Sequence, residues 1–394
     1  MNRLRYYMLV VACICLIVGA GCGEEYRTVV DSRGVPVQVP TEIDRVVTIS
    51  DGLVEGVMIR LGVIDTLVGL GSGCIPQVYE YEYPTVKGVS YIYQSGMNPV
   101  TYLYPQLINL PVVAQWATAP NYEMLASLEP DVVIVRAGDC TFWMDKDSMD
   151  KAINTIESLG LTLVVTRGPN TFDEPKISIL SNEIKLIGSI FGKDDKAIEL
   201  SNYLENQVKF VQERTKDIPE SEKPKVLMFG LSPRAREAGA SGNVWGLNSI
   251  ESYMVESVVN ARNAYQESTE YRIMSFEQIL ALEPDIIILP TSFGYHPPRE
   301  LYEAPYYQNL QEMDAVKNKR VAALPWSPCN CDKRLEYPID IMVIAKTAYP
   351  ESFDDVDLGE WLLDFYMNVY NVDQETAIGI RSAQWMDWTL EDNS

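Results

Sequence analysis

A short pattern occurs twice in this chain, once in each half. Residues 123–131, EMLASLEPD, precede the apolar run VVIV, and residues 277–285, EQILALEPD, precede IIIL. In each copy the proline would end a helix, because it lacks an amide N–H and clashes with the preceding turn. The apolar run suits a strand covered on both faces. Leu-Glu-Pro-Asp is also common αβ-loop chemistry, but a duplicated helix, turn and strand predicts two similar lobes.

Other short runs rich in Val, Ile and Leu alternate with amphipathic stretches along the whole chain. This alternation is typical of an α/β fold with mainly parallel sheets. The predicted strands are residues 46–50, 67–70, 132–135, 161–166, 226–229, 286–289 and 321–324.

A long helical segment separates the two sets of predicted strands. Its apolar residues recur at helical spacing, at Ala197, Leu200, Leu204, Val208 and Val211. We interpret it as one long helix that joins the lobes. The predicted organisation is an amino-terminal α/β lobe at 23–172, a connecting helical segment at 173–218, and a carboxy-terminal α/β lobe with a helical extension at 219–394.

Residues 1–22 are typical of an export signal. Arg3 and Arg5 precede an apolar stretch at 6–20 that is too short to span a membrane comfortably. The sequence Gly-Ala-Gly-Cys that ends at Cys22 is similar to the lipobox at which lipoproteins are cleaved and lipidated, although the usual leucine is missing. An uncleaved membrane anchor is the alternative. Both interpretations place the rest of the chain outside the cytoplasmic membrane.

The charge balance argues against nucleic-acid binding. The formal net charge of -23 repels phosphate backbones and suits either a well-hydrated surface or a cationic ligand. The chain also lacks the Gly-Lys-Ser/Thr phosphate loop, the His-Glu-x-x-His helix and the Gly-x-Ser-x-Gly elbow. With a single histidine it has few general bases, so an exported α/β enzyme is the less favoured function class.

Taken in order, these features resemble the cobalamin, haem and iron-siderophore binding proteins of ABC importers. Departures are a tyrosine-rich segment at 75–110 and an extension from about residue 351. The segments that carry the resemblance are 28–34, 40–50, 61–63, 68–70, 116–131, 239–260 and 277–285.

The resemblance implies a class III substrate-binding protein, in which two Rossmann-like lobes are joined by one long helix. Such a protein is not an enzyme and requires no cofactor. It would capture an iron complex (siderophore or haem) or cobalamin between its lobes, outside the cytoplasmic membrane. It would be a monomer whose partners are an ABC permease dimer and its ATPase subunits, and it would touch the membrane only through a lipid on Cys22.

Ligands of open α/β sheets bind beyond the carboxyl ends of the strands, so we expect the site in the loops that follow each strand. Trp116 matches a ligand-contacting position in the resembling family. For the other tryptophans, packing within a lobe is an equal alternative, and the arginines are either partners of ligand carboxylates or surface residues. The further candidates are Cys74, Arg136, Cys140, Trp143, Arg234, Trp245, Tyr295, His296, Trp326 and Arg334.

The cysteines allow two interpretations. In an exported protein, Cys74 with Cys140 and Cys329 with Cys331 would form disulfides. Alternatively these four thiolates and His296 form a metal site, in which case the protein binds a free transition-metal ion.

The repeat also predicts a partner site. In the resembling family an exposed glutamate on each lobe docks to arginines of the permease, and the matching residues are Glu123 and Glu277. Stabilisation of the helix by its dipole is the alternative role for both. For the tyrosine-rich segment, a lid, a widened cleft and a solvent-facing hairpin all remain open.

Overall fold

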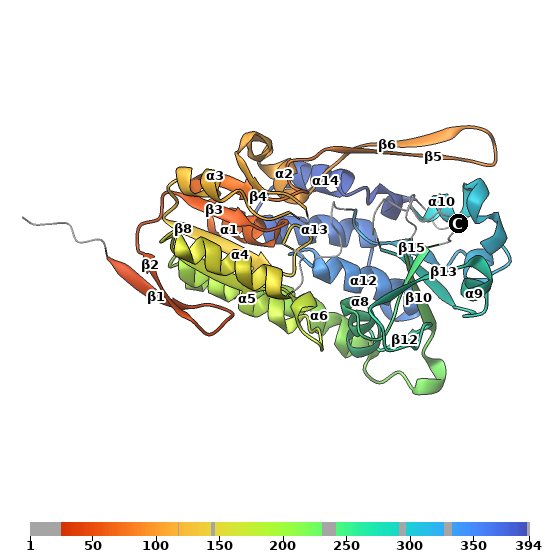
Figure 1. Cartoon of the computed structure of the whole chain (residues 1–394). Coiled ribbons are helices and arrows are strands. Elements are labelled where there is room, and N and C mark those ends of the chain that lie inside the picture. Colours follow the sequence, from red (N-terminus) through yellow and green to blue (C-terminus); the bar gives the residue numbers. More distant parts are fainter. Residues whose placement is uncertain are drawn as a thin grey trace, which may run out of the picture.

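The computed structural model describes residues 25–116, 118–142, 146–230, 242–290, 297–326 and 333–391. Within them, two central sheets with helices on both faces lie at opposite ends of the molecule (Figure 1). The α/β fold with two lobes that the sequence predicts is therefore confirmed.

The sheet of the first lobe is entirely parallel and has the order β7-β4-β3-β8-β9. Its inner strands are short apolar runs buried on both faces, as parallel strands require. Helices α3 and α4 cover one face, and α1 and α5 cover the other. The bounds are β3 Val46–Ile49, β4 Leu67–Gly71, β7 Val112–Ala114, β8 Val132–Ala137, β9 Leu163–Arg167, α1 Leu53–Leu61, α3 Tyr122–Ser127, α4 Lys146–Ser158 and α5 Ser178–Ile190.

The sheet of the second lobe is mixed, in the order β13-β11-β10-β14-β15. Strands β10, β14 and β15 are parallel, and β12 pairs in parallel with β10, whereas β11 and β13 run antiparallel. The bounds are β10 Lys225–Gly230, β11 Gly242–Trp245, β12 Arg262–Asn263, β13 Tyr271–Met274, β14 Ile286–Leu289, β15 Val321–Ala323, α8 Ile250–Tyr253, α9 Phe276–Leu280, α10 Pro298–Glu303 and α11 Asp314–Lys317.

The two copies of the sequence repeat adopt the same backbone conformation. Each helix, α3 and α9, ends shortly before a glutamate with positive φ, which is 44° at Glu129 and 45° at Glu283. This left-handed conformation is uncommon for a residue with a side chain, so its occurrence at equivalent places supports a true structural repeat.

The aspartate that ends each repeat also plays the same role in both lobes. Oδ2 of Asp131 accepts a hydrogen bond from the Arg45 amide at 2.8 Å, and Oδ2 of Asp285 accepts one from the Lys225 amide at 2.7 Å. Each carboxylate thus holds the start of the strand beside its own. The duplicated unit predicted from the sequence is confirmed in structural detail.

The connecting segment consists of two packed helices rather than one. Helix α5 packs against the first lobe, and α6 (Asp194–Thr215) is the long helix of 22 residues. Gly192, with φ of 61°, reverses the chain between them, a conformation that glycine adopts without steric cost. The predicted periodicity is correct, because Ala197, Leu200 and Leu204 all lie on the buried face of α6.

The carboxy-terminal helices do not extend the second lobe alone. Helix α12 (Tyr337–Ala348) packs against α6 and the second sheet, whereas α13 (Leu358–Tyr370) and α14 (Gln374–Ala383) pack against α1 and α2 (Pro99–Leu103) of the first lobe. One hydrophobic core therefore runs from the first sheet through these helices into the second. A continuous core of this kind restricts relative movement of the lobes.

The tyrosine-rich segment is a hairpin of β5 (Tyr79–Pro84) and β6 (Ser90–Gly96) that reaches from the first lobe over the second (Figure 1). The amide of Val86 donates a hydrogen bond to the Glu303 carbonyl at 2.8 Å, and Tyr83 is fully buried in the core of the second lobe. The hairpin face that carries Tyr83 is therefore covered by the second lobe, and the hairpin links the two lobes.

A second hairpin, of β1 (Tyr26–Val30) and β2 (Pro36–Pro40), contains the segment 28–34 that carries part of the resemblance. Among the residues that the structure describes, no helix combines the length and apolar character needed to cross a membrane. The predicted signal segment, including Cys22, lies outside the described residues.

Candidate functional site

The carboxyl ends of β3, β4 and β8 meet at the edge of the first sheet that faces the second lobe (Figure 1). The loops that follow them are held by one buried carboxylate, Asp51. Its Oδ1 accepts hydrogen bonds from the hydroxyls of Ser72 at 2.6 Å and Thr141 at 2.7 Å. Its Oδ2 accepts one from the Thr141 amide at 2.7 Å. Both oxygens are thus used to join three loops.

The two hydroxyls extend this network into the loop after β4. Ser72 Oγ accepts hydrogen bonds from the amides of Cys74 at 3.1 Å and Ile75 at 3.0 Å. Thr141 Oγ1 accepts one from the Gly73 amide at 2.8 Å. The backbone from Gly73 to Ile75 is therefore positioned by side chains that themselves depend on Asp51.

Arg136, a predicted ligand-binding residue, is buried beneath these loops. Its guanidinium forms two hydrogen bonds of 2.9 Å with the Glu183 carboxylate and one of 2.6 Å with Asp139. All three side chains are buried. The positive charge of Arg136 is thus paired with two carboxylates inside the lobe, and its contact with a ligand carboxylate stays a prediction.

Two buried carboxyl groups of this region have raised pKa values. Burial, together with the charges of Asp139 and Asp51, raises the pKa of Glu55 to about 7. Burial also raises the pKa of Asp139 to about 6, although the positive charge of Arg136 opposes the effect. An apolar environment disfavours the ionised form, which is the common cause of both shifts.

The structure brings three of the predicted site residues close together. Trp116 follows β7, is 56% exposed and lies against Gly73. Cys74 and Cys140 lie in the loops pinned by Asp51, and both are disulfide-bonded. A sulfur atom in a disulfide has no thiolate to offer a metal, so at these two positions the structure favours the disulfide alternative.

Among the described residues, no group of three or more His, Cys, Asp or Glu side chains is arranged to hold a metal ion. His296, Cys329 and Cys331, the remaining members of the predicted metal site, lie outside those residues, as do Trp143, Arg234 and Tyr295.

Two predicted ligand-binding tryptophans, Trp245 and Trp326, are buried in the protein. Trp245 is buried in the main core. Trp326 packs against Trp385, with ring centroids 4.3 Å apart, and against Tyr79 of the hairpin at 5.2 Å. Both tryptophans are buried, which agrees with the packing alternative, and their contact with a ligand stays a prediction.

Arg334 is buried between the lobes. Its Nε donates a hydrogen bond to the Asp51 carbonyl, which also accepts one from Asn98 Nδ2 at 3.2 Å. Arg334 is therefore not a surface residue, because its side chain reaches across to the first lobe, and its pairing with a ligand stays a prediction.

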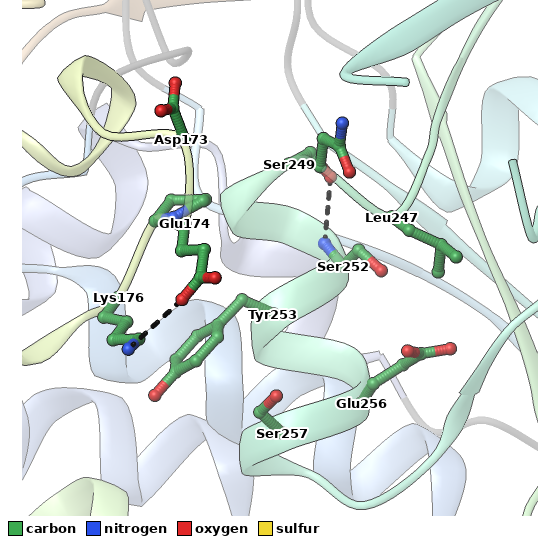
Figure 2. A pocket seen from close by; sticks show the side chains of 11 residues that line it. Asp173, Glu174, Lys176, Leu247, Ser249, Ser252, Tyr253, Glu256 and Ser257 are labelled. Carbon is green, nitrogen blue, oxygen red and sulfur yellow. Dashed lines mark hydrogen bonds and ion pairs between the residues drawn. The ribbon is translucent and has the colours of Figure 1, made fainter. Parts of the chain in front are cut away.

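A pocket of about 300 Å³ opens where α8 of the second lobe faces the segment before α5 (Figure 2). Its lining is polar. Lys176 is paired with Glu174 at 3.6 Å, and Ser249 Oγ accepts a hydrogen bond from the Ser252 amide at 3.0 Å. The other residues that line it are Asp173, Pro175, Leu247, Asn248, Tyr253, Glu256 and Ser257.

The carboxylates of this pocket outnumber its ammonium groups. Figure 2 shows Asp173 and Glu174 on one wall and Glu256 on the other. The single lysine, Lys176, lies beside Glu174, which offsets its charge. Among the described residues, this wall of the interlobe region therefore favours a cationic or hydroxyl-rich ligand over an oxyanion.

Glu123 and Glu277 occupy matching places on the two lobes. Both are exposed in the first turn of their helices, α3 and α9. A hydrogen bond of 2.7 Å from the Ser275 hydroxyl lowers the pKa of Glu277. Both carboxylates are thus presented to solvent.

Sequence reasoning missed Asp51 and the pocket. Asp51 stands directly after the predicted strand at 46–50, so its position at the carboxyl end of a strand was the signal that could have identified it. The pocket had no such signal. Its two walls, around Asp173 and Ser249, are far apart in the sequence, and only folding brings them together.

Comparisons with known proteins agree with this architecture. MolA, the molybdate-binding protein of Haemophilus influenzae, is 26% identical over 346 residues, which cover 84% of this chain and 90% of MolA. YvrC, an uncharacterised ABC transporter substrate-binding lipoprotein of Bacillus subtilis, is 24% identical over 238 residues, 60% of this chain and 67% of YvrC. A periplasmic solute binding protein of Veillonella parvula has a similar structure, with a TM-score of 0.68 and 21% identity over 93% of this chain and 99% of that protein.

These structural relatives are class III binding proteins with two lobes, the architecture that the resemblance implied. The family described as periplasmic binding protein matches residues 79–328 of the 394, which is more than half of the chain. This protein therefore belongs to the periplasmic binding protein family.

Proposed function

We propose that this protein is the substrate-binding component of an ABC importer and that its cargo is a metal chelate held between the lobes. The observation that supports this most directly is the polar pocket of about 300 Å³ between α8 and the segment before α5. Family membership supports the role of a binding protein rather than an enzyme.

Two features support a chelate. Outside the residues that line the pocket, Trp116 offers an exposed aromatic ring, which can stack on a planar or aromatic ligand at little entropic cost. The carboxylates of Asp173, Glu174 and Glu256 disfavour an oxyanion such as the molybdate that MolA binds.

The experiment is a titration of the soluble body, residues 23–394, followed by tryptophan fluorescence. Ferric siderophores, haem, cobalamin, molybdate and bare divalent ions are added separately. We expect saturable quenching by one chelate and a loss of most of that quenching in Trp116→Ala. Trp361→Phe is the matched control, because Trp361 is partly buried on α13 and packs against Phe365. Saturation by molybdate or by a bare ion alone would refute the chelate assignment.

We also propose that Glu123 and Glu277 dock to the permease. Their exposure at equivalent places on the two lobes supports a partner that contacts both lobes at once. The double variant Glu123→Ala, Glu277→Ala should keep its ligand affinity and lose uptake of the chelate. Glu199→Ala, an exposed glutamate on α6, is the control for a general loss of surface charge. Normal uptake by the double variant would contradict the docking role.

Anchoring of the protein at the outer face of the cytoplasmic membrane is likewise a proposal. The supporting features are the signal-like segment at 1–22 and the family itself. Metabolic labelling with a fatty acid should label the wild-type protein and leave Cys22→Ala unlabelled. Equal labelling of both proteins would contradict lipidation at Cys22.

A further inference from the structure

We propose that Asp51 is the positioning residue of the interlobe site, and that Arg334 connects it to the second lobe. The buried Asp51 carboxylate holds the loops that carry Cys74 and Cys140, and Trp116 lies against Gly73 in the first of them. This proposal rests on the proposed function only for its effect on affinity, because its structural part concerns the protein without ligand.

The carboxylate of Asp51 is fully committed to neighbouring loops. It lies at 0% exposure and accepts three hydrogen bonds, from the Ser72 and Thr141 hydroxyls and the Thr141 amide. The Asp51 amide donates in turn to Asp139 Oδ2 at 2.7 Å. A charged acceptor in a buried network forms stronger hydrogen bonds than a neutral one, so its geometry is tightly defined.

The side chains that donate to Asp51 in turn hold the loop after β4. The Ser72 and Thr141 hydroxyls accept hydrogen bonds from the amides of Gly73, Cys74 and Ile75. Gly73 lies directly against Trp116, where an added Cβ would come within 3.2 Å of the Trp116 backbone nitrogen. A shift of the loop after β4 would therefore move the exposed Trp116 ring.

The same unit is joined to the second lobe through the segment that precedes α12. Arg334 Nε donates to the Asp51 carbonyl. Its neighbour Lys333 is buried and paired with Asp340 at 3.0 Å and with Glu251 at 3.2 Å. Glu251 lies on α8, the helix that forms one wall of the pocket. The adjacent residues Lys333 and Arg334 therefore fix the position of α8 relative to the Asp51 loops.

The first experiment is hydrogen exchange of the ligand-free protein, resolved to residues 72–75 and 139–142. Asp51→Asn keeps the shape of the side chain but removes its charge and places an amide where acceptors are needed. We expect the amides of Gly73, Cys74, Ile75 and Thr141 to exchange at least tenfold faster than in the wild type. Protection equal to the wild type in a folded Asp51→Asn protein would overturn the proposal.

Asp31→Asn is the matched control. Asp31 is also a buried carboxylate of the first lobe, and it accepts amide hydrogen bonds from Arg33 at 2.8 Å and from Val165 at 3.3 Å. It belongs to the β1–β2 hairpin and makes no contact with the Asp51 loops in these bonds. Asp31→Asn should leave exchange at 72–75 unchanged, and an equal effect of both variants would show a general loss of stability and overturn the proposal.

A second pair of variants keeps the test decisive if Asp51→Asn does not fold. Thr141→Ser retains the hydroxyl that links Asp51 to the Gly73 amide, whereas Thr141→Val removes it at similar volume. We expect Thr141→Val to loosen the loop like Asp51→Asn and Thr141→Ser to behave like the wild type. Identical behaviour of the two variants would overturn the role assigned to this network.

Measuring the chelate affinity of the variants tests the positioning role of Asp51 separately from the proposed function. With the chelate that quenches the wild type, Asp51→Asn and Arg334→Gln should each bind at least tenfold more weakly, while Asp31→Asn stays within twofold. Unchanged affinity in both cleft variants would overturn the positioning role. If the wild type binds no chelate, the proposed function fails, and hydrogen exchange still decides whether Asp51 positions the loops.

Discussion

The two lobes agree at one end of their sheets and differ at the other. Where the strands begin, Asp131 and Asp285 cap the neighbouring strand in the same way, each after a glutamate with positive φ. Where the strands end, the first lobe has a fully parallel edge pinned by Asp51, whereas in the second lobe β11 turns back antiparallel beside β10.

This difference shows which parts of the repeat serve the fold and which serve binding. The starts of the strands face away from the other lobe, so they carry structural chemistry that both copies retain. The carboxyl ends face the other lobe, where we propose that the ligand binds, so we expect them to differ between the two copies. The asymmetry extends to the β5–β6 hairpin, which begins in the first lobe and packs in the core of the second.

The largest effect is expected at Tyr83, whose ring belongs to the first lobe by sequence and to the second by packing. Tyr83→Ala would remove a fully buried ring and should lower the free energy of unfolding by about 3–5 kcal/mol. Urea unfolding followed by circular dichroism measures this loss, and limited proteolysis should then cut near Gly88 at the hairpin tip.

Tyr83→Phe is the control for this prediction. The Tyr83 hydroxyl is buried without a hydrogen-bond partner among the described residues, so its removal should cost nothing. A loss of stability in Tyr83→Phe similar to that in Tyr83→Ala would mean that the hydroxyl, rather than packing of the ring, holds the hairpin.

A smaller effect, dependent on pH, is expected at Glu55 in the first lobe. Because burial raises its pKa from 4.5 to about 7, the folded protein binds more protons than the unfolded chain between these values. The stability contributed by this group therefore falls as the pH rises from about 4.5 to 7. Glu55→Gln, which resembles the neutral acid, should match the wild type at pH 4.5 and exceed it at pH 8 by at most about 3 kcal/mol.

Glu251 in the second lobe is a buried glutamate for which we expect the opposite effect on stability. Glu251 lies beside the buried ammonium of Lys333, whose charge needs its carboxylate partners. Glu251→Gln should therefore destabilise the protein at pH 8, opposite in sign to Glu55→Gln. Chemical denaturation at both pH values measures the two differences, and a gain in stability for both variants at pH 8 would contradict this account of the two lobes.

The strand-capping aspartates should show a still smaller difference. Asp131 accepts hydrogen bonds from the amides of Asp44 and Arg45, whereas Asp285 accepts one from Lys225. Each variant, Asp131→Ala and Asp285→Ala, should cost about 1–3 kcal/mol, with the larger loss in the first lobe. Thermal unfolding of these variants and of the matched Asp→Asn variants measures the two losses of stability. A larger loss for Asp285→Ala than for Asp131→Ala would contradict the prediction.

The smallest effect concerns the basic residues at the strand starts. Arg45 donates from its guanidinium to the carbonyls of Leu128 and Glu129, and Lys225 reaches the Glu283 carbonyl at 3.4 Å. Arg45→Lys should therefore cost about 1 kcal/mol or less, and Lys225→Arg should be neutral or slightly stabilising. Denaturant midpoints measure both changes. A loss of stability in Lys225→Arg would show that the surroundings of Arg45 and Lys225 differ, although the backbones at the two strand starts are alike.

Particular residues show how far the sequence could predict the structure. The apolar runs and the spacing of Ala197 to Val211 are local patterns, so the strands and the long helix α6 were predictable. For Arg136, Trp326 and Arg334, the sequence did not reveal the buried contacts that each side chain makes. Their partners, Glu183, Trp385 and Asp51, are distant in sequence, and no local pattern indicates such pairings.

The sequence alone determined the two lobes, their repeated helix-turn-strand unit and the resemblance to a family of binding proteins, because each depends on short-range periodicity or on the order of local motifs. Only the tertiary structure decided which residues share the pocket, that Asp51 joins three loops, and that the tyrosine hairpin packs on the opposite lobe. The physical reason is that burial and charge pairing depend on neighbours in space, which a linear pattern of residue types does not specify.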